Sequence, residues 1–400
     1  MEKRKIINDP VYDGFLSLDD PVILSLIEHP YFQRHRRIKQ LGLTYLVYPG
    51  AMHSRFSHML GALNLMGRAL DTLRLKGVEI TDDECRGAKL AILLHDIGHG
   101  PFSHTSERVL VDIPHEELTL MMMERINSQP GTPAFHALDT AIAIFRNQHP
   151  KHFLHQLVSS QLDMDRLDYL GRDSYFTGVS EGIVGTDRII SMLNVYTPQP
   201  FCGQSHCPSS ELVVDEKGIY SVEKFIISRR LMYWQVYMHK TVIAADQLLL
   251  NILRRAREVN ATAPSSALSP FMHTLFTSDD FRRNPSLLDN FAALDDDDVM
   301  VAVKQWQHSD DPILATLSAN LIQRRLPAIR LSNEPFPIQQ DSYFVGTGIL
   351  SNRSYDFADQ EIKVLFKDGR CLPISEASDQ LDRRFLEKQV TKYFYYFPKE

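Results

Sequence analysis

Apolar residues recur every three or four positions along most of the first 330 residues, which is the spacing that gives an α-helix one buried face. In residues 58–75, for example, Leu60, Leu63 and Leu70 fall on the same side of such a helix. The same spacing predicts further helices over residues 88–94, 115–128, 134–147, 151–175, 186–194, 221–256 and 311–325. Most of the chain is therefore predicted to be helical.

Patterns typical of strands are few in this part of the chain. Residues 46–48, which precede a Pro-Gly pair, predict a short strand. Residues 212–214 and 219–220, on either side of Glu216-Lys217-Gly218, predict a hairpin. We expect these strands to be small additions to a helical body.

The composition changes near Leu326-Pro327, and the apolar runs that follow are short. Residues 362–366 and 371–374 flank an Asp-Gly pair, which is a strong hairpin pattern. We therefore expect a mainly α fold, with a helical body over residues 1–330 and a small C-terminal α+β appendage over residues 331–400.

Four consecutive aspartates, residues 295–298, stand before the helical pattern of Val299, Val303 and Trp306. Acidic side chains complement the positive end of the helix dipole. We interpret this run as the start of a helix, and a cation site is the alternative.

Composition and charge exclude several classes of protein. Hydrophobic residues make up 44% of the chain and charged residues 23%, which is ordinary for a globular protein. The net charge of −7 argues against broad binding of nucleic acid. No run approaches the length of a membrane-spanning helix, and the start of the chain does not resemble a secretory signal, so we expect a cytoplasmic protein.

The four cysteines are too few and too scattered for a disulfide framework. Cys202 and Cys207, with His206 between them, form a weak metal-binding pattern that no second pair completes. We interpret this segment as a loop. The remaining cysteines are Cys85 and Cys371.

Histidines are concentrated in one part of the chain, since six of the 16 lie between residues 53 and 115. The most specific segment is His95-Asp96, where an apolar helix ends and Gly98 follows. A helix that ends in this pair presents an imidazole and a carboxylate together, and such donors suit Mn, Fe, Zn or Ni. The six histidines are His53, His58, His95, His99, His104 and His115.

Two further helices carry polar faces. At about 100° per residue, Tyr169, Arg172 and Asp173 share a face with Asp165, whereas Asp163 lies opposite and is interpreted as a capping residue. The alternative for this face is a salt-bridged surface helix. A second face, which could hold phosphate and stack a sugar or base, consists of Arg229, Tyr233, Tyr237 and Lys240. Its alternative is aromatic packing with surface charges.

Together these residues resemble the HD-domain metal-dependent phosphohydrolases, and among them the deoxynucleoside triphosphate triphosphohydrolases of the SAM-and-HD-domain type. The matches run in order over residues 5 to 240. They comprise Asn8-Asp9-Pro10 and residues 39–58 (KQLGLTYLVYPGAMHSRFSH), 94–104 (LHDIGHGPFSH), 164–173 (MDRLDYLGRD) and 237–240 (YMHK). The spacing of the implied ligands is shared by many phosphohydrolases. The residues that flank these ligands are more specific to this family.

The resemblance implies roles for individual residues. The implied metal ligands are His58, His95, Asp96 and Asp165. The implied catalytic group near the α-phosphate is His99, His104, His115 and Glu116. The implied phosphate holders are Arg55, Arg166, Tyr169, Tyr237 and Lys240, and Arg229 and Tyr233 complete the substrate-binding set. Gln40 and Asp173 match positions that bond the sugar 3′-hydroxyl, and Tyr237 would crowd the 2′ position.

The chemistry of α-phosphate hydrolysis agrees with these roles. A divalent transition metal supplies charge and activates water, and Mg²⁺ usually accompanies a triphosphate. Histidines near the metal serve as acid or base close to neutral pH. We favour His104 for direct participation and Glu116 as support for His115, and the division of steps among the three histidines stays open.

The resemblance also implies a regulatory nucleotide site at a subunit interface. Lys5, Gln33 and Arg36 match its positions, whereas Glu28 replaces an aspartate. A homo-oligomer, dimer or tetramer, would accompany such a site. No membrane partner is expected.

The predicted function is hydrolysis of a deoxynucleoside triphosphate to deoxynucleoside and inorganic triphosphate. Tyr233 stands where close relatives tend to have a histidine, which keeps open a phosphohydrolase of nucleoside monophosphates, cyclic nucleotides or alarmones. A nucleotide-sensing protein with an inactive HD site is the alternative from another class.

Overall fold

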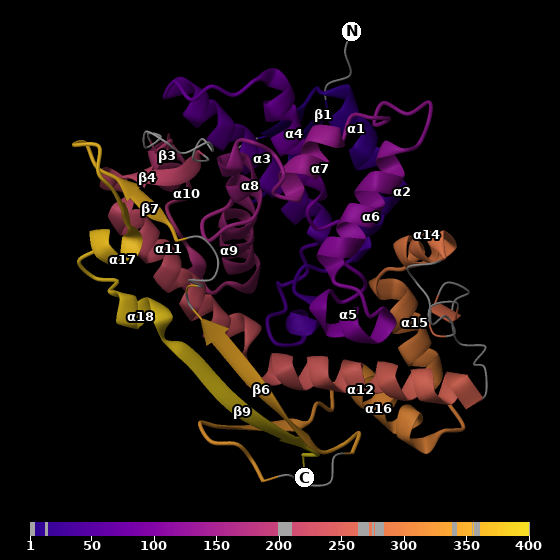
Figure 1. Cartoon of the computed structure of the whole chain (residues 1–400). Helices are drawn as coiled ribbons and strands as arrows, with labels where there is room; N and C mark the ends of the chain where they lie inside the picture. Colours follow the sequence, from indigo (N-terminus) through magenta and orange to yellow (C-terminus); the bar gives the residue numbers. More distant parts are fainter. Residues whose placement is uncertain are drawn as a thin grey trace.

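The computed structural model describes residues 5–12, 15–198, 210–262, 272–273, 276, 284–337, 342–353, 355 and 361–399, without the side chains of residues 104, 106, 108, 261, 262, 285 and 353. Helices dominate these residues, and the strands form small sheets at the periphery (Figure 1). The prediction of a mainly α fold is confirmed. No helix in the described ranges has the length and hydrophobicity that crossing a bilayer requires.

The helices of the first half surround α3 and α9. Their bounds are α1 (Pro21–Glu28), α2 (Pro30–Gln33), α3 (Arg55–Leu75), α4 (Asp82–Leu94), α5 (His104–Leu110), α6 (His115–Asn127), α7 (Asp139–Phe145), α8 (His152–Val158) and α9 (Met164–Thr177). The single helix predicted over residues 151–175 is wrong, because Asp163 accepts hydrogen bonds from the Ser160 and Arg166 backbone and starts α9 as a new helix. The interpretation of Asp163 as a capping residue is confirmed.

The second half of the chain continues with further helices. They are α10 (Thr186–Met192), α11 (Ile219–Met232), α12 (Lys240–Thr262), α14 (Pro285–Ala293), α15 (Asp296–Trp306), α16 (Pro312–Ile322), α17 (Ile374–Ala377) and α18 (Arg383–Glu387). A π-helical turn over Tyr233–Tyr237 separates α11 from α12, so the pattern over residues 221–256 is not one helix. Asp295 and Asp298 form a capping box at the start of α15, which confirms the predicted helix start.

Within the described residues, three sheets lie around the helices. Antiparallel β1 (Lys5–Asn8) and β2 (Phe15–Leu18) form the first. The second has the order β3 (Leu193–Tyr196), β4 (Glu211–Asp215), β7 (Lys363–Leu365) and β8 (Cys371–Pro373), and the third has the order β5 (Ala328–Ser332), β9 (Gln389–Phe397) and β6 (Gly346–Arg353). The Asp-Gly hairpin is confirmed as β7–β8, and the parallel pair β4–β7 joins the last 70 residues to the helical body.

Two predicted strand features are wrong. Gly42–Leu46 forms a 3₁₀-helix, and the Thr44 carbonyl accepts hydrogen bonds from the amides of Val47 and Tyr48, so this backbone is satisfied locally. Glu216–Gly218 is a helical turn that leads into α11, so no hairpin forms there. The strand β4 pairs with β3 and β7 instead.

The core lies where α3 packs between α4 and α9, and it includes fully buried Leu65, Leu70 and Leu90. Helix α3 approaches α9 closely at Gly61. A Cβ atom there would lie 1.9 Å from the Asp168 Oδ1 atom and 2.2 Å from the Arg172 Nη2 atom. The absence of a side chain at residue 61 therefore allows a polar network on α9 to contact α3 directly.

Candidate metal centre

Four side chains from three helices converge in the middle of the molecule. His58 lies in the first turn of α3, His95 and Asp96 follow α4, and Asp165 lies in the first turn of α9. The His58 Nε2 atom is 3.3 Å from the His95 Nε2 atom and 3.0 Å from the Asp165 Oδ1 atom. Asp96 oxygens lie 3.7 Å from the His58 Nε2 atom and 3.5 Å from the His95 Nε2 atom.

Both imidazoles are held by their other nitrogen. The Nδ1 atom of His58 is 2.7 Å from the Asp168 Oδ2 atom, and the Nδ1 atom of His95 is 2.6 Å from the Ile92 carbonyl oxygen. Such contacts orient metal-ligating histidines and leave their Nε2 atoms as donors. His58, His95 and Asp96 form a group that could hold a metal ion, and the Asp165 Oδ1 atom lies 3.0 Å from the His58 Nε2 atom and 3.4 Å from the His95 Nε2 atom. Imidazole and carboxylate donors of this kind fit a divalent transition metal.

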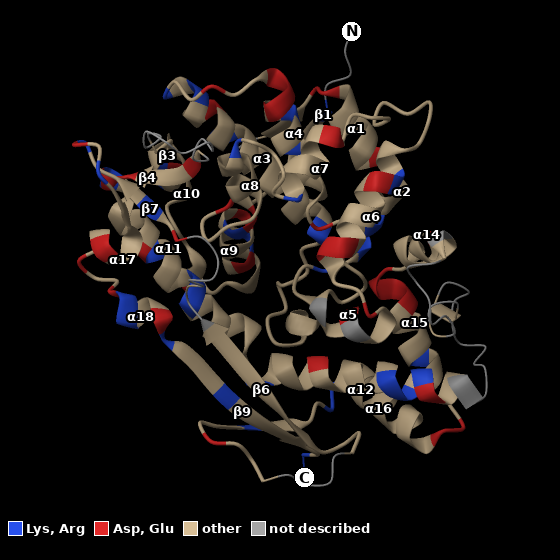
Figure 2. Ribbon diagram, viewed as in Figure 1, with Lys and Arg blue, Asp and Glu red and all other residues tan. Residues whose placement is uncertain are grey.

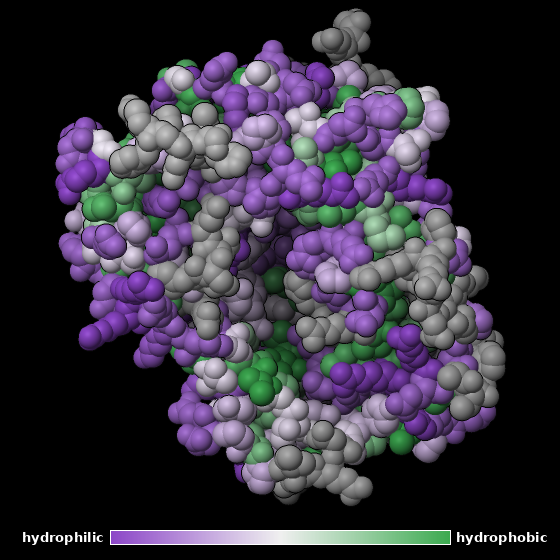
Figure 3. Space-filling model, viewed as in Figure 1, coloured by the Kyte–Doolittle hydropathy of each residue, from purple (hydrophilic) through white to green (hydrophobic). Residues whose placement is uncertain are grey.

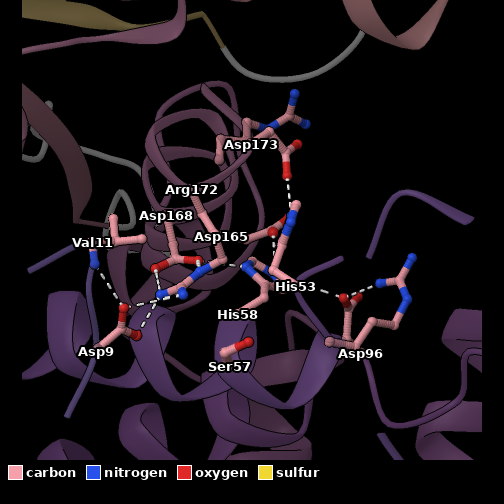
Figure 4. A network of polar contacts seen from close by, with 12 residues as sticks. Asp9, Val11, His53, Ser57, His58, Asp96, Asp165, Asp168, Arg172 and Asp173 are labelled. Atoms are coloured by element: carbon pink, nitrogen blue, oxygen red, sulfur yellow. Dashed lines mark hydrogen bonds and ion pairs between the residues drawn. The ribbon is translucent and has the colours of Figure 1, made fainter. Parts of the chain in front are cut away.

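A buried network of ion pairs and hydrogen bonds contacts His58 at its Nδ1 atom (Figure 4). Asp168 accepts hydrogen bonds from Arg172, at 2.8 and 3.0 Å, and from the Tyr12 hydroxyl at 2.5 Å. Arg172 also donates to Asp9, at 2.7 and 3.2 Å. The sequence pattern placed Arg172 on the same helix face as Asp165 but assigned it no role. It did not identify Asp168 as the partner of His58, although Asp168 and Arg172 both lie in the segment MDRLDYLGRD.

The network changes the ionisation of its members. Burial alone would lower the pKa of His58, but hydrogen bonds to Asp165 and Asp168 outweigh it and raise the pKa to about 10. Burial would raise the pKa of Asp96, but Arg55 and the neighbouring histidines hold it well below its usual value. The metal-free site is therefore an anionic pair of carboxylates beside a protonated imidazole.

Metal affinity is expected to rise steeply with pH. His58 carries a proton at neutral pH in the metal-free protein and must lose it to bind a metal, so the affinity should rise about tenfold per pH unit between pH 6.5 and 8.5. Calorimetric titration with Mn²⁺ at pH 6.5, 7.5 and 8.5 measures this slope. Asp168→Asn removes one cause of the raised pKa and should flatten the slope, whereas a flat slope in the unsubstituted protein would contradict the argument.

The predicted catalytic residues gather beside Asp96. The His99 Nε2 atom is 3.4 Å from the Asp96 Oδ1 atom, and the His99 and His115 rings stack with centroids 3.9 Å apart. The His115 Nε2 atom is 3.4 Å from a Glu116 oxygen. The side chain of His104 lies outside the described residues, although its backbone begins α5.

Glu107 is a residue that sequence reasoning missed. Its Oε1 atom accepts the His115 amide at 2.8 Å and lies 3.0 Å from the His115 Nδ1 atom. It therefore contacts His115 more closely than Glu116 does. The sequence signal that could have identified Glu107 is its position three residues after His104 on the same helix, α5. Burial would lower the pKa of His115, but hydrogen bonding to Glu107 outweighs it and raises the pKa.

Asp173 occupies the far end of α9 in a fixed position. Its Oδ1 atom is 2.8 Å from the His53 Nε2 atom, and its Oδ2 atom accepts the Tyr237 hydroxyl at 2.7 Å. The His53 ring stacks on Phe176. His53 belongs to the histidine cluster noted in the sequence but had no predicted role.

Gln40 and Arg229 each carry a buried polar atom without a partner among the described residues. These atoms are the Gln40 Oε1 atom and the Arg229 Nε atom. Another guanidinium nitrogen of Arg229 donates to Gln161 at 3.3 Å. Unsatisfied buried groups are rare in native proteins and are expected where a ligand binds.

The remaining predicted substrate residues lie at the start of α3, on α9 and around the π-helical turn. Arg166 pairs with Asp163 at 3.0 Å, and Arg55 contacts Asp96 and donates to the Ser103 hydroxyl at 2.8 Å. Tyr237 makes edge contacts with the rings of Tyr169 and Tyr233, whose centroids lie 6.4 and 5.2 Å away. Lys240 is exposed at the start of α12.

The predicted regulatory residues lie apart from these contacts. Lys5 pairs with Glu28, and Arg36 donates to Gln33 at 2.9 Å and covers the Phe56 ring at 3.6 Å. Cys202, His206 and Cys207 lie outside the described residues, so the loop interpretation stays a prediction.

The surface is hollowed above the centre of the molecule, as Figure 3 shows. Figure 2 shows basic and acidic positions together on α9 and basic positions at the end of α11, where Arg229 and Arg230 lie.

Comparison with protein families finds two matches. Residues 55–173 match the HD domain, and residues 203–281 match the HD associated region. The first range contains all four predicted metal ligands and Asp173.

Individual relatives agree with these matches. The uncharacterized protein YwfO of Bacillus subtilis is 35% identical over 335 residues, which cover 82% of this chain and 72% of that protein. Human deoxynucleoside triphosphate triphosphohydrolase SAMHD1 is 33% identical over 293 residues, and this chain spans only 45% of its length. A crystal structure of a phosphohydrolase from Bacteroides thetaiotaomicron matches 99% of this chain and 100% of that chain with a TM-score of 0.90 and 43% identity.

Proposed function

This chain belongs to the HD-domain phosphohydrolases, and we propose that it hydrolyses deoxynucleoside triphosphates to a deoxynucleoside and inorganic triphosphate. One observation carries this choice of substrate. Asp173 lies two turns along α9 from the metal donor Asp165 and is held from two sides by His53 and Tyr237. The relatives named deoxynucleoside triphosphate triphosphohydrolase support the same substrate class.

The fixed carboxylate suits a sugar hydroxyl. Asp173 has the oxygen atoms to accept a hydrogen bond from a 3′-hydroxyl, and the buried Oε1 atom of Gln40 offers a second acceptor. Because Tyr237 is tied to Asp173, its ring is held beside the sugar and leaves little room for a 2′-hydroxyl. A deoxyribose is therefore favoured over a ribose.

In the reaction, a water oxygen bonds to the α-phosphorus, the bond to the sugar 5′-oxygen breaks, and that oxygen takes a proton. A divalent metal held by His58, His95, Asp96 and Asp165 would supply charge to phosphate oxygens and ease deprotonation of water. Arg55 fixes the Asp96 carboxylate in place. Mg²⁺ is proposed to accompany the triphosphate.

The histidine pair is suited to moving the proton. The raised pKa of His115 favours its protonated form, and Glu107 fixes its ring. Burial lowers the pKa of His99 well below its usual value, and Arg55 lowers it further, so His99 is neutral. We therefore assign proton donation to His115, with His104 as the other candidate.

A second phosphohydrolase function has one observation in its favour. Arg166 is engaged by Asp163 and Arg229 by Gln161, which leaves fewer open cations for a triphosphate tail. A nucleoside monophosphate, cyclic nucleotide or alarmone needs a different set of charge contacts. Tyr233 instead of a histidine in the same region agrees with this alternative.

Product analysis tests the proposal. The protein, loaded with Mn²⁺ and supplied with Mg²⁺, is incubated with each dNTP alone, with all four together and with the matching rNTPs, and products are separated by ion exchange. Deoxynucleoside and triphosphate in equal amounts are expected. The rNTPs should be hydrolysed at least about fivefold more slowly, because one steric clash costs about 1 kcal/mol or more.

The other outcomes are equally informative. Hydrolysis of monophosphates or cyclic nucleotides, without hydrolysis of any dNTP by the metal-loaded protein, would select the alternative function. Activity in the mixture alone would support the predicted regulatory site at Lys5, Gln33 and Arg36. A Tyr237→Ala variant that discriminated against rNTPs as well as the unsubstituted protein would contradict the role given to that ring.

A further inference from the structure

An unusual turn leads into α5. Phe102 and Ser103 both have positive φ angles, of 54° and 53°, although neither is a glycine. Such conformations cost about 1–3 kcal/mol each and persist where surrounding contacts over-determine them. The Phe102 amide donates a hydrogen bond of 2.8 Å to the Asp296 Oδ1 atom. A residue from α15, far away in the sequence, therefore holds this turn.

The other oxygen of Asp296 holds a second segment. Its Oδ2 atom accepts the Lys39 amide at 3.0 Å and lies 3.4 Å from the Lys39 Nζ atom. Lys39 precedes Gln40, whose amide donates to the His53 carbonyl at 3.0 Å. One carboxylate thus binds the backbone of two segments that border the metal centre.

The two segments also contact each other and the metal donors. The Ser103 hydroxyl donates to the Lys39 carbonyl at 3.4 Å and accepts the Arg55 Nε atom at 2.8 Å. Arg55 in turn contacts Asp96. A continuous chain of polar contacts therefore runs from Asp296 through Ser103 and Arg55 to a metal donor.

The position of Asp296 is itself well fixed. Its side chain is fully buried, and it is the first residue of α15. The preceding Asp295 caps this helix and pairs with Arg37, which anchors the helix end against the segment before Lys39. A buried carboxylate costs stability unless it is hydrogen-bonded, and here two backbone amides satisfy it. Asp295 and Asp296 themselves lie outside both family-matched ranges, 55–173 and 203–281.

We propose that Asp296 is a positioning residue for the phosphohydrolase site, which sets Gln40, Arg55 and the start of α5 relative to Asp96. The argument needs the phosphohydrolase site but not the identity of its substrate. Because Asp296 acts through backbone amides and Arg55, its loss should impair turnover without removing the metal.

Asp296→Asn tests this directly. The amide keeps the size of the side chain but replaces one acceptor oxygen with an NH₂ group that faces a backbone N–H. Asp297→Asn is the matched control, because Asp297 is the next residue and is exposed. Three quantities are compared: hydrogen exchange of the amides of residues 38–40 and 102–104, metal content, and kcat with KM.

For Asp296→Asn we expect faster exchange in both segments, full metal content, and a kcat lower by about 10- to 100-fold, since small displacements of catalytic groups cost that much. The control should match the unsubstituted protein. Unchanged exchange in either segment, or a loss of kcat no larger than the loss of bound metal, would overturn the proposal. Exchange needs no known substrate, so failure to hydrolyse any dNTP would count against the proposed function alone.

Ser103→Ala covers the case in which Asp296→Asn does not fold. It cuts the link between the turn and Arg55 but leaves the Asp296 contacts intact. We expect unaltered exchange at residues 38–40, full metal content and a kcat lower by about tenfold, the value of one buried hydrogen bond to a charged group. An unchanged kcat in this variant would also overturn the proposal.

Discussion

The double substitution His95→Gln with Asp96→Asn is expected to abolish metal binding and to lower turnover by about 10⁴-fold or more, because a catalytic metal supplies several kcal/mol of transition-state stabilisation. It removes two of the four predicted donors, whose nitrogen and oxygen atoms lie 3.0 to 3.7 Å from a neighbouring donor. The amides keep the size of both side chains, so Arg55 keeps a neighbour and the fold should persist. Metal content by mass spectrometry and phosphate-ester hydrolysis measure the result.

His308→Gln with Asp310→Asn is the matched control. This control makes the same two chemical changes at exposed residues that follow α15 and lie two positions apart in the sequence. The control should bind metal and turn over substrate like the unsubstituted protein, and both variants should give the same circular dichroism. Full activity in the His95 and Asp96 variant would refute the assignment of the metal centre.

The second large effect concerns stability. Arg172→Met is expected to lower the free energy of unfolding by about 3–5 kcal/mol, because removing one partner of a buried ion pair leaves uncompensated buried charge. Arg172 is fully buried, and its removal takes this ion-pair partner from the buried carboxylates of Asp9 and Asp168. Urea denaturation of the metal-free protein, followed by fluorescence, measures this difference.

The same substitution should weaken metal binding. Arg172 holds Asp168, and Asp168 holds the His58 imidazole, so the affinity should fall by about 10- to 100-fold. Arg68→Met is the control, since Arg68 pairs with the exposed Asp187 and such surface pairs are worth about 0–1 kcal/mol. If Arg172→Met were no more destabilising than Arg68→Met, the ionic network would not support the site.

Some elements follow from local sequence. The capping box of Thr81 with Glu84, the aspartates at the start of α15 and the Asp-Gly turn between β7 and β8 each satisfy their hydrogen bonds within a few residues. Such contacts form whatever the rest of the chain does, so their patterns predict them. The helical body and the His95-Asp96 helix end were predictable for this reason.

Other elements depend on distant partners. The parallel pairing of β4 with β7 joins segments about 150 residues apart, and the segment predicted as a hairpin partner of β4 begins a helix instead. The single helix predicted across residues 151–175 breaks because Asp163 finds two backbone amides. Hydrophobic spacing identifies an apolar face but does not reveal which distant segment covers it.

The residues of the candidate site likewise fall into those that local sequence identifies and those that depend on the fold. The sequence by itself determined the donor types and their helices, because His58, His95-Asp96 and Asp165 lie in recognisable segments. Only the tertiary structure revealed that Asp168 contacts His58, that Glu107 contacts His115 and that Asp296 binds the Phe102 amide. A buried polar group must be satisfied by whichever group packing brings within about 3 Å, and that neighbour is decided by the whole fold rather than by local spacing.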